Sequence, residues 1–248
     1  GYGGALYTVP FAGDHEDPAA LVARAAETQA KLVYLSNPDN PMGSWHDAAR
    51  IEAALDRLPE HALLVLDEAY ADFAPAGAIP ALNPQDRRLI RMRTFSKAHG
   101  LAGLRVGYAI AHPDLIAAFH KVRNHFGMCR LSQVAALASL HDRDHLAQTV
   151  ARVRAAKDDP AGISGANGLD ALPSATNFVA IDCGQDGDFA RTVLQELVAR
   201  DVFVRMPGVA PLDRCIRVSA GPAEDTVAFA RALPLALAAV RETTLAGT

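Results

Sequence analysis

The sequence feature that most constrains the fold is an unbroken apolar run at residues 62–66, Ala-Leu-Leu-Val-Leu. A strand with one wet face alternates apolar and polar residues, whereas an unbroken run is typical of a parallel strand covered on both faces. Further strands are predicted at residues 32–36 and 105–111, and helical spacing is present at 18–29. This alternation predicts an α/β fold with a mostly parallel sheet and helices on both faces.

The pattern changes after a charged, alanine-rich helix that is predicted at residues 144–157 and ends at an Asp-Asp-Pro sequence, 158–160. We therefore predict a large domain over residues 1–145 and a small C-terminal α+β domain over 146–248. Near the start of the chain, residues 6–10 are predicted to form an interior strand. In the small domain, strands are expected at 178–181, 202–204 and 215–219, and helices at 188–200 and 223–240.

Composition excludes several classes of protein. A net charge of −4 and a pI near 6.1 give no electrostatic basis for binding nucleic acid or an anionic membrane surface. The longest apolar stretch, residues 232–240, is too short to span a bilayer. The three cysteines are odd in number and widely spaced, which argues against a disulfide framework and against a metal site, and suits the reducing cytoplasm.

Polar residues follow two of the predicted strands. Residues 37–43, Asn-Pro-Asp-Asn-Pro-Met-Gly, form a rigid turn after the strand at 32–36, and Asp67 directly follows the unbroken apolar run. The carboxyl edge of an open α/β sheet is where ligands bind, and a carboxylate at that place needs a cation or a strong donor. A plain strand-to-helix turn and a helix N-cap aspartate are the alternatives. Ser44 with Asp47 is also predicted to open the next helix as a capping box.

Lys97 is the one lysine of four that lies outside a charge-rich, helix-like segment. A lysine attacks a carbonyl group when its surroundings favour the neutral amine, and pyridoxal phosphate is an aldehyde cofactor that needs a lysine, an acid and phosphate donors. Thr94, Ser96 and Arg105 are residue types that bind phosphate. The alternative is a surface loop with a solvated lysine.

The segment from Thr94 to Tyr108, Thr-Phe-Ser-Lys-Ala-His-Gly-Leu-Ala-Gly-Leu-Arg-Val-Gly-Tyr, resembles the Schiff-base segment of class I/II aminotransferases of fold type I. The resemblance is greatest to the histidinol-phosphate aminotransferase group, and it extends from about Leu32 to Arg217. In that family a long segment precedes the position of Gly1, including a glycine-containing loop that holds the cofactor phosphate at a helix N-terminus. The resemblance therefore implies that the N-terminal part of the family pattern is absent from this chain.

The same resemblance implies a role for each of the residues that follow the strands. Lys97 would carry pyridoxal 5'-phosphate as a Schiff base, Asp67 would bind the pyridine nitrogen, and Asn40 and Tyr70 would contact the ring oxygen. Thr94, Ser96 and Arg105 remain the expected phosphate contacts. Met42 stands where the family usually has threonine.

Substrate contacts are predicted in the small domain. Arg217 alternates with apolar neighbours on a strand, so its side chain faces opposite to theirs and can bind a carboxylate or phosphate in two parallel hydrogen bonds. By resemblance, Arg205 is a second anionic contact and Asn177 lies at the pocket; for Arg205 a rim charge is the alternative. His125 and Gly127 stand where the histidinol-phosphate group has proline and asparagine.

The expected activity is therefore that of a pyridoxal-phosphate-dependent transaminase in amino-acid biosynthesis, working as a homodimer. It would move an amino group between an amino acid or a histidinol-phosphate-like amino-alcohol phosphate and a 2-oxo acid. The freed Lys97 amine would carry the proton between substrate and cofactor. A phosphothreonine-decarboxylase-like enzyme of the same fold and a non-catalytic truncated homologue are the alternatives.

Overall fold

A computed structural model describes residues 3–246 of the protein, which form two compact units. The first unit comprises the described residues up to Asp39 together with Trp45–Leu146, and the second comprises Asn40–Ser44 and the residues from Ala147 onward. Among the helices in the described range, none is long and apolar enough to cross a membrane.

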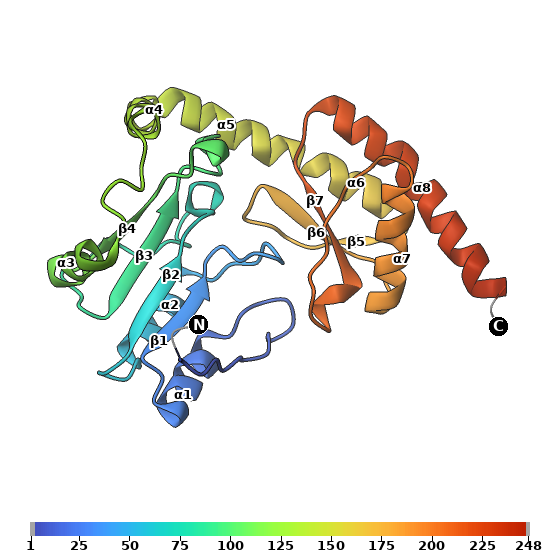
Figure 1. The fold of residues 1–248 in the computed structure, drawn as a ribbon. Coiled ribbons are helices and arrows are strands. Elements are labelled where there is room, and N and C mark those ends of the chain that lie inside the picture. The colour runs from blue at the N-terminus through green and yellow to red at the C-terminus, as the bar shows by residue number, and fades with distance from the viewer. Residues whose placement is uncertain (1–2, 247–248) are drawn as a thin grey trace. The chain divides into compact units, whose positions relative to one another are not determined.

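A four-stranded sheet forms the centre of the first unit (Figure 1), with β1, β2 and β3 parallel and β4 antiparallel to β3. The prediction of a mostly parallel α/β sheet is therefore confirmed. The strands follow one another in the order of the sequence: β1 (Leu32–Ser36), β2 (Leu63–Asp67), β3 (Leu89–Thr94) and β4 (Gly107–Ala111).

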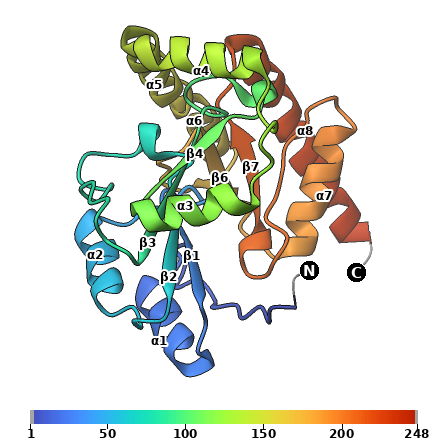
Figure 2. The same ribbon diagram turned by 60° about the vertical axis from the view of Figure 1, so that its left-hand side comes forward.

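Helices α1 (Pro18–Thr28) and α2 (Ala48–Asp56) pack on one face of this sheet (Figure 2). On β1 the side chains of Val33 and Leu35 are buried in their shared core, whereas alternate positions are exposed, Tyr34 by 55%. β2 alternates likewise between buried and half-buried residues. The half-buried face carries Asp67.

The remaining elements of the first unit come mostly after β3. A 3-10 turn, η1 (Ala71–Phe73), follows β2, and another, η2 (Ala102–Leu104), precedes β4. The helices that follow β4 are α3 (Pro113–Val122), α4 (Arg130–His141) and α5 (Arg143–Ala156), and α5 continues into the second unit.

Local side-chain hydrogen bonds explain where the first helices begin. Asp17 caps α1 because its Oδ1 accepts from the N–H groups of Ala19 at 3.0 Å and Ala20 at 3.2 Å. Asp47 precedes α2, but neither it nor Ser44 forms a side-chain cap, so the predicted capping box is wrong. Asn37 orders this turn instead.

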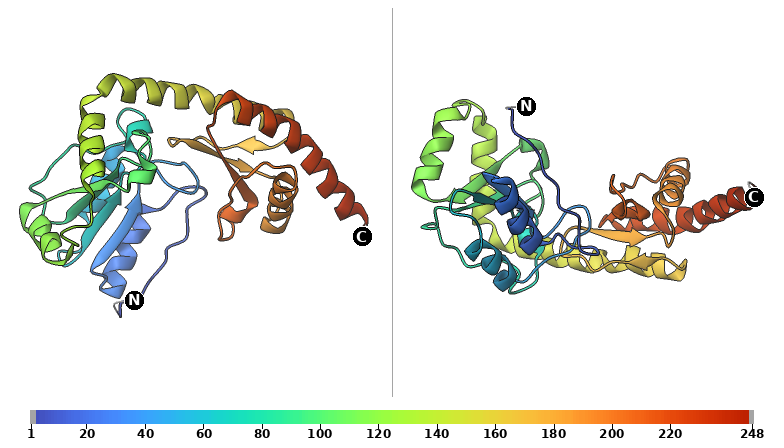
Figure 3. Two further views of the ribbon diagram at one scale, coloured as in Figure 1. Left: turned by 45° about the horizontal axis from the view of Figure 1, so that its top comes forward. Right: turned by 90° about the horizontal axis from the view of Figure 1, so that it is seen from below.

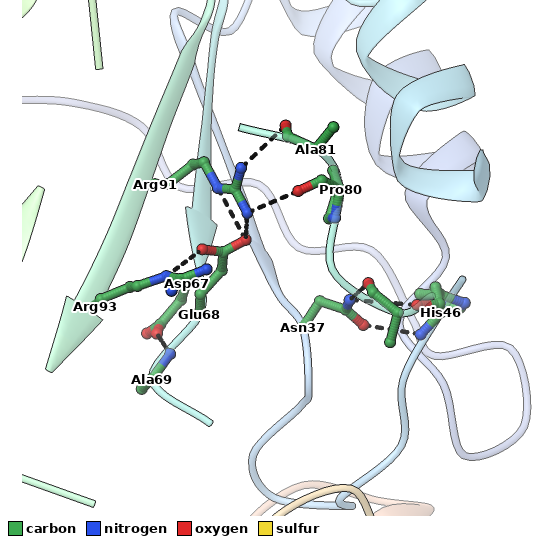
Figure 4. Close-up of polar contacts among 10 residues, drawn as sticks. Asn37, His46, Asp67, Glu68, Ala69, Pro80, Ala81, Arg91 and Arg93 are labelled. Carbon is green, nitrogen blue, oxygen red and sulfur yellow. Dashed lines mark hydrogen bonds and ion pairs between the residues drawn. The ribbon is translucent and has the colours of Figure 1, made fainter. Parts of the chain in front are cut away.

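The side-chain amide of Asn37 is fully buried, and both its oxygen and its nitrogen form hydrogen bonds (Figure 4). Its oxygen accepts from the His46 N–H at 2.8 Å, and its nitrogen donates to the carbonyls of Ala78 at 2.9 Å and His46 at 3.3 Å. These bonds fix the chain just before α2 without a cap.

The second unit is an α+β structure, as predicted, with helices packed on a three-stranded antiparallel sheet of order β5-β6-β7. Figure 3 shows α8 as a continuous helix, although Pro234 lies within it. The elements are α6 (Asp158–Ala166), β5 (Asp170–Ala171), β6 (Phe178–Asp182), α7 (Gly187–Val198), η3 (Leu212–Arg214), β7 (Cys215–Ser219) and α8 (Ala223–Ala246).

Two further sequence predictions are wrong. Residues 6–10 form no strand and Leu6 is 89% exposed, because this segment has no strand to pair with in the described chain. Residues 202–204 form no strand either, since Val202 donates its N–H to Leu197 at the end of α7. The helix predicted at 144–157 does end at the Asp-Asp-Pro sequence, as α5, and that prediction is confirmed. A new helix, α6, begins at residues 158–160, because two aspartates complement the helix dipole and a first-turn proline lacks only an N–H that would be unpaired there.

The core of the second unit generates a stability prediction. Leu233 is fully buried in the core between α7, α8 and the sheet, whereas Leu235, on the same helix, is 59% exposed. We expect Leu233→Ala to lower the free energy of unfolding by about 2–5 kcal/mol, and Leu235→Ala by less than about 0.5 kcal/mol. Urea unfolding followed by circular dichroism measures both, and equal effects would contradict the assigned packing.

Candidate active site

An open cavity of about 400 Å³ lies in the first unit, where β2 and β3 end and β4 begins. It collects five of the residues predicted to bind a cofactor, from three separate stretches of sequence. Gly107 permits close approach here, because a Cβ at this position would lie 2.9 Å from the carbonyl oxygen of Arg93. The lining residues are Asp67, Ala69, Met92, Arg93, Thr94, Ser96, Lys97, Arg105, Val106 and Gly107.

Asp67 is the last residue of β2 and lies in register with Ser36 on β1 and Met92 on β3. Its Oδ1 accepts from the N–H of Ala69 at 2.9 Å, and its Oδ2 accepts from the hydroxyl of Tyr34 at 2.5 Å. The expected strong donor is therefore a tyrosine, which sequence reasoning missed. Each carboxylate oxygen has a further lone pair, so Asp67 can still accept from a ligand.

Lys97 lies in a tight loop that follows β3. The N–H of Gly100 donates to the Lys97 carbonyl at 2.9 Å, and Gly100 has φ +70°, a conformation that favours glycine. The N–H of Leu101 closes the loop on Phe95, also at 2.9 Å. The half-buried Lys97 places its Nζ 5.0 Å from the ring centroid of the buried Tyr70. Backbone hydrogen bonds thus hold the loop at Lys97, and the amine lies beside an aromatic ring.

Two hydroxyls and a guanidinium lie together at the same cavity. The Thr94 Oγ1 accepts from the Ser96 N–H at 3.0 Å, and Arg105 Nη1 donates to the Ser96 Oγ at 3.4 Å and to the Ala102 carbonyl at 2.9 Å. Arg105 has φ +53°, so it occupies the left-handed region at the end of η2. Because hydroxyls and arginine are strong phosphate donors, this cluster is suited to a phosphate group.

The other predicted site residues lie in the second unit. Arg217 on β7 is half-buried, donates to the side-chain oxygen of Asn40, and lies over the ring of Phe178 at 4.6 Å. Arg205 and Arg217 pair through their backbones and line a cavity of about 510 Å³. Asn177 directly precedes β6 and is half-buried. The structure therefore brings Asn40, Arg205 and Arg217 together.

Next to Asp67 lies a buried charge network that sequence reasoning missed (Figure 4). The Glu68 Oε1 accepts from Arg91 Nε at 2.9 Å and Nη2 at 2.5 Å, and its Oε2 accepts from Arg93 Nε at 2.9 Å. Arg91 also donates to the carbonyls of Pro80 at 3.0 Å and Ala81 at 3.1 Å. The network joins the end of β2 to β3 and to the loop after η1. The acid after an apolar run was visible in the sequence, but its partners were not.

A second missed acid is Glu16, in the segment before α1. Its Oε2 accepts from the N–H of Ser36 at 2.9 Å, at the outer edge of β1. The pKa of Glu16 is raised to about 8, mainly by burial and also by the nearby charges of Asp39 and Asp67, while the Ser36 hydrogen bond acts in the opposite direction. Glu16 is therefore mainly protonated at neutral pH.

The model of the family "Aminotransferase class I and II" matches residues 1–233, so the chain belongs to this family. The chain is 39% identical over 240 residues to histidinol-phosphate aminotransferase 1 of Nitrosococcus oceani. The matched region covers 93% of this chain and 62% of that protein.

Solved structures agree with this assignment. The crystal structure of histidinol-phosphate aminotransferase from Sinorhizobium meliloti in complex with pyridoxal-5'-phosphate matches with a TM-score of 0.95 and 48% identity, over 96% of this chain and 66% of that one. L-Threonine-O-3-phosphate decarboxylase from Porphyromonas gingivalis has the same fold, with a TM-score of 0.74 and 21% identity, over 91% of this chain and 69% of that one. The chain thus spans somewhat under two thirds of the two aminotransferases.

Two arginine–carboxylate ion pairs of equal length but different exposure predict different losses of stability. The Arg91–Glu68 pair and the Arg87–Asp114 pair both span 2.5 Å, but the first pair is 3% and 0% exposed and the second 67% and 68%. Arg91→Met leaves Glu68 with one partner, so we expect a loss of about 3–5 kcal/mol in the free energy of unfolding. Arg87→Met is expected to cost less than about 1 kcal/mol. Similar losses in urea unfolding would refute this account.

Glu16 predicts a pH dependence of stability. Its pKa of about 8 in the folded protein lies above the ordinary value of 4.5, so folding takes up a proton between these values and stability falls as pH rises through them. Glu16→Gln keeps an acceptor for Ser36 but cannot ionise. We expect it to gain stability relative to the parent across this window, reaching on the order of 2 kcal/mol above pH 8. Urea unfolding at several pH values, with the exposed Glu60→Gln as control, measures the difference; parallel pH profiles would contradict it.

Proposed function

We propose that this protein is a pyridoxal-phosphate-dependent aminotransferase that moves an amino group between a histidinol-phosphate-like amino-alcohol phosphate, or an amino acid, and a 2-oxo acid. The observation that carries the proposal is the placement of Lys97 and Asp67 at one cavity with Thr94, Ser96 and Arg105. Similarity to histidinol-phosphate aminotransferases, one of them solved with pyridoxal-5'-phosphate, supports it.

The residues present fit the cofactor. Asp67 has acceptor capacity left after its bonds to Tyr34 and Ala69, as a protonated pyridine nitrogen requires. Arg105 and the Ser96 hydroxyl offer the donors that a phosphate needs. The Thr94 hydroxyl donates to the Val106 carbonyl at 3.3 Å and would turn from it to join them when a phosphate binds. Bound pyridoxal phosphate would supply an electron sink that acidifies the substrate α-carbon.

The chain's own residues then have distinct tasks. The Lys97 amine is the nucleophile that would hold the cofactor. Once the amino substrate has displaced it, the amine would be the base that moves the proton between the substrate α-carbon and the cofactor carbon. Asp67 holds the pyridine nitrogen in its protonated form, and Tyr70 orients the ring through its hydroxyl. The loop closed by Gly100 holds the backbone of Lys97 at the end of β3.

Substrate recognition is assigned to the second unit. Arg217 is the proposed contact for the substrate's acidic group, with Arg205 as a second anionic contact, Asn177 at the pocket, and Asn40 on the cofactor ring hydroxyl. The hydrogen bond that the Arg217 guanidinium donates to the Asn40 side-chain oxygen supports placing these two side chains at the same site. We further propose a homodimer in the cytoplasm, serving amino-acid biosynthesis, with the first unit as the cofactor domain and the second as the small domain.

A direct test is amino transfer from histidinol phosphate to 2-oxoglutarate by the protein that carries this sequence, loaded with pyridoxal phosphate. Glutamate formation is expected, and Lys97→Ala should lower kcat by about a thousandfold or more, because it removes both nucleophile and base. Lys121→Ala, at an exposed position on α3, should leave the rate unchanged.

Two results would contradict this function. Release of carbon dioxide from phosphothreonine without glutamate formation would favour the decarboxylase alternative. Failure of the folded protein to take up the cofactor would favour the non-catalytic alternative.

A further inference from the structure

A phenol hydroxyl on β1 contacts the aspartate that is assigned to the cofactor. Tyr34 lies in register with Val65 on β2, so Asp67, two residues further along, lies diagonally from it on the same face of the sheet. The Tyr34 hydroxyl donates to Asp67 Oδ2 at 2.5 Å. This length is within the range of a charge-assisted O–H···O⁻ hydrogen bond, the stronger class of such bonds.

The surroundings keep the proton on Tyr34. Partial burial raises the pKa of Tyr34 well above its ordinary value of 10.0, although the side chain as a whole is 55% exposed. The hydrogen bond to Asp67 and the negative charges of Asp67, of Asp39 and, once it ionises, of Glu16 act in the same direction. Tyr34 therefore remains a donor over the whole neutral pH range.

The arginines next to Asp67 are bound elsewhere. Arg91 and Arg93 both pair with Glu68, and within the described part of the chain Asp67 forms no ion pair. There, Tyr34 provides the one side-chain hydrogen bond to Asp67, and Ala69 provides a backbone one. The negative charge of Asp67 is thus stabilised by donors that leave it available to a cationic ligand.

We propose that Tyr34 is a positioning residue that fixes the plane of the Asp67 carboxylate and stabilises its negative charge, so that the proton stays on the pyridine nitrogen of the cofactor. A hydrogen bond to the charged form of an acid favours that form. Without the Tyr34 donor, Asp67 competes better for the shared proton. This inference rests on the proposed function, because it presupposes the cofactor.

The test is Tyr34→Phe in the protein loaded with pyridoxal phosphate that carries nitrogen-15 in its ring. We expect the ring-nitrogen NMR signal to move toward that of unprotonated pyridine and kcat to fall about tenfold or more, with little change in KM. Tyr7→Phe is the matched control, because Tyr7 is 48% exposed and lies on a segment outside the sheet. It should reproduce the parent in both measurements.

A second variant separates proton placement from packing. A fluorinated tyrosine at position 34 keeps the ring shape but has a more acidic, more strongly donating hydroxyl, so the ring-nitrogen signal should move toward the protonated form, opposite to Tyr34→Phe. A ring-nitrogen signal that is the same in the parent and both variants would overturn the inference, whatever happens to kcat. A parent protein with no cofactor on Lys97 would instead contradict the proposed function as well.

Discussion

The site depends on one buried carboxylate, Glu68, which is shared by Arg91 and Arg93. Transferring a charged side chain from water to the protein interior costs more free energy than a single hydrogen bond regains. Each of these three side chains is therefore stable in its buried position only when its partners are present. Their bonds join the ends of β2 and β3, and Arg91 extends the link to the carbonyls of Pro80 and Ala81. The carboxyl edge of the sheet is thereby rigid where Asp67 and Lys97 face the cavity.

The adjacent acids Asp67, the last residue of β2, and Glu68, which directly follows it, are used differently because neighbouring residues of an extended chain point to opposite faces. Glu68 is enclosed and takes both arginines, whereas Asp67 is half-buried and bonds to a phenol and a backbone N–H. The arginines would neutralise Asp67 if they reached it. Their engagement by Glu68 leaves Asp67 as an acceptor for a ligand, which is what a protonated pyridine nitrogen requires.

Most of the cavity could be predicted from the sequence, because parallel strands place their carboxyl ends at one edge. Asp67 follows an apolar strand, Lys97 follows the next, and their convergence follows from the sheet alone. The helix at 18–28 was likewise visible from apolar spacing, and the helix at 48–56 was expected from the pattern of Ser44 with Asp47. Their starts were less predictable: Asp17 caps its helix, but the buried amide of Asn37 replaces a cap at the second.

The contacts that could not be predicted are those between residues that are far apart in the sequence. Tyr34 looked like an ordinary strand residue, and its bond to Asp67 depends on the register of β1 against β2. The arginines of β3 looked like a charged strand, because nothing local indicates that Glu68 lies between them. Residues 6–10 and 202–204 have strand-like composition, but a strand forms only where a neighbour offers its free backbone groups.

The most direct measurement of the central claim is borohydride reduction of the protein with pyridoxal phosphate, followed by peptide mass mapping of all four lysines. If the edge formed by β2 and β3 is a cofactor site, the reduced adduct appears on Lys97 alone, and Asp67→Ala weakens cofactor uptake without moving the adduct. Labelling spread over Lys31, Lys121 and Lys157, or no labelling of the folded protein, would contradict the account.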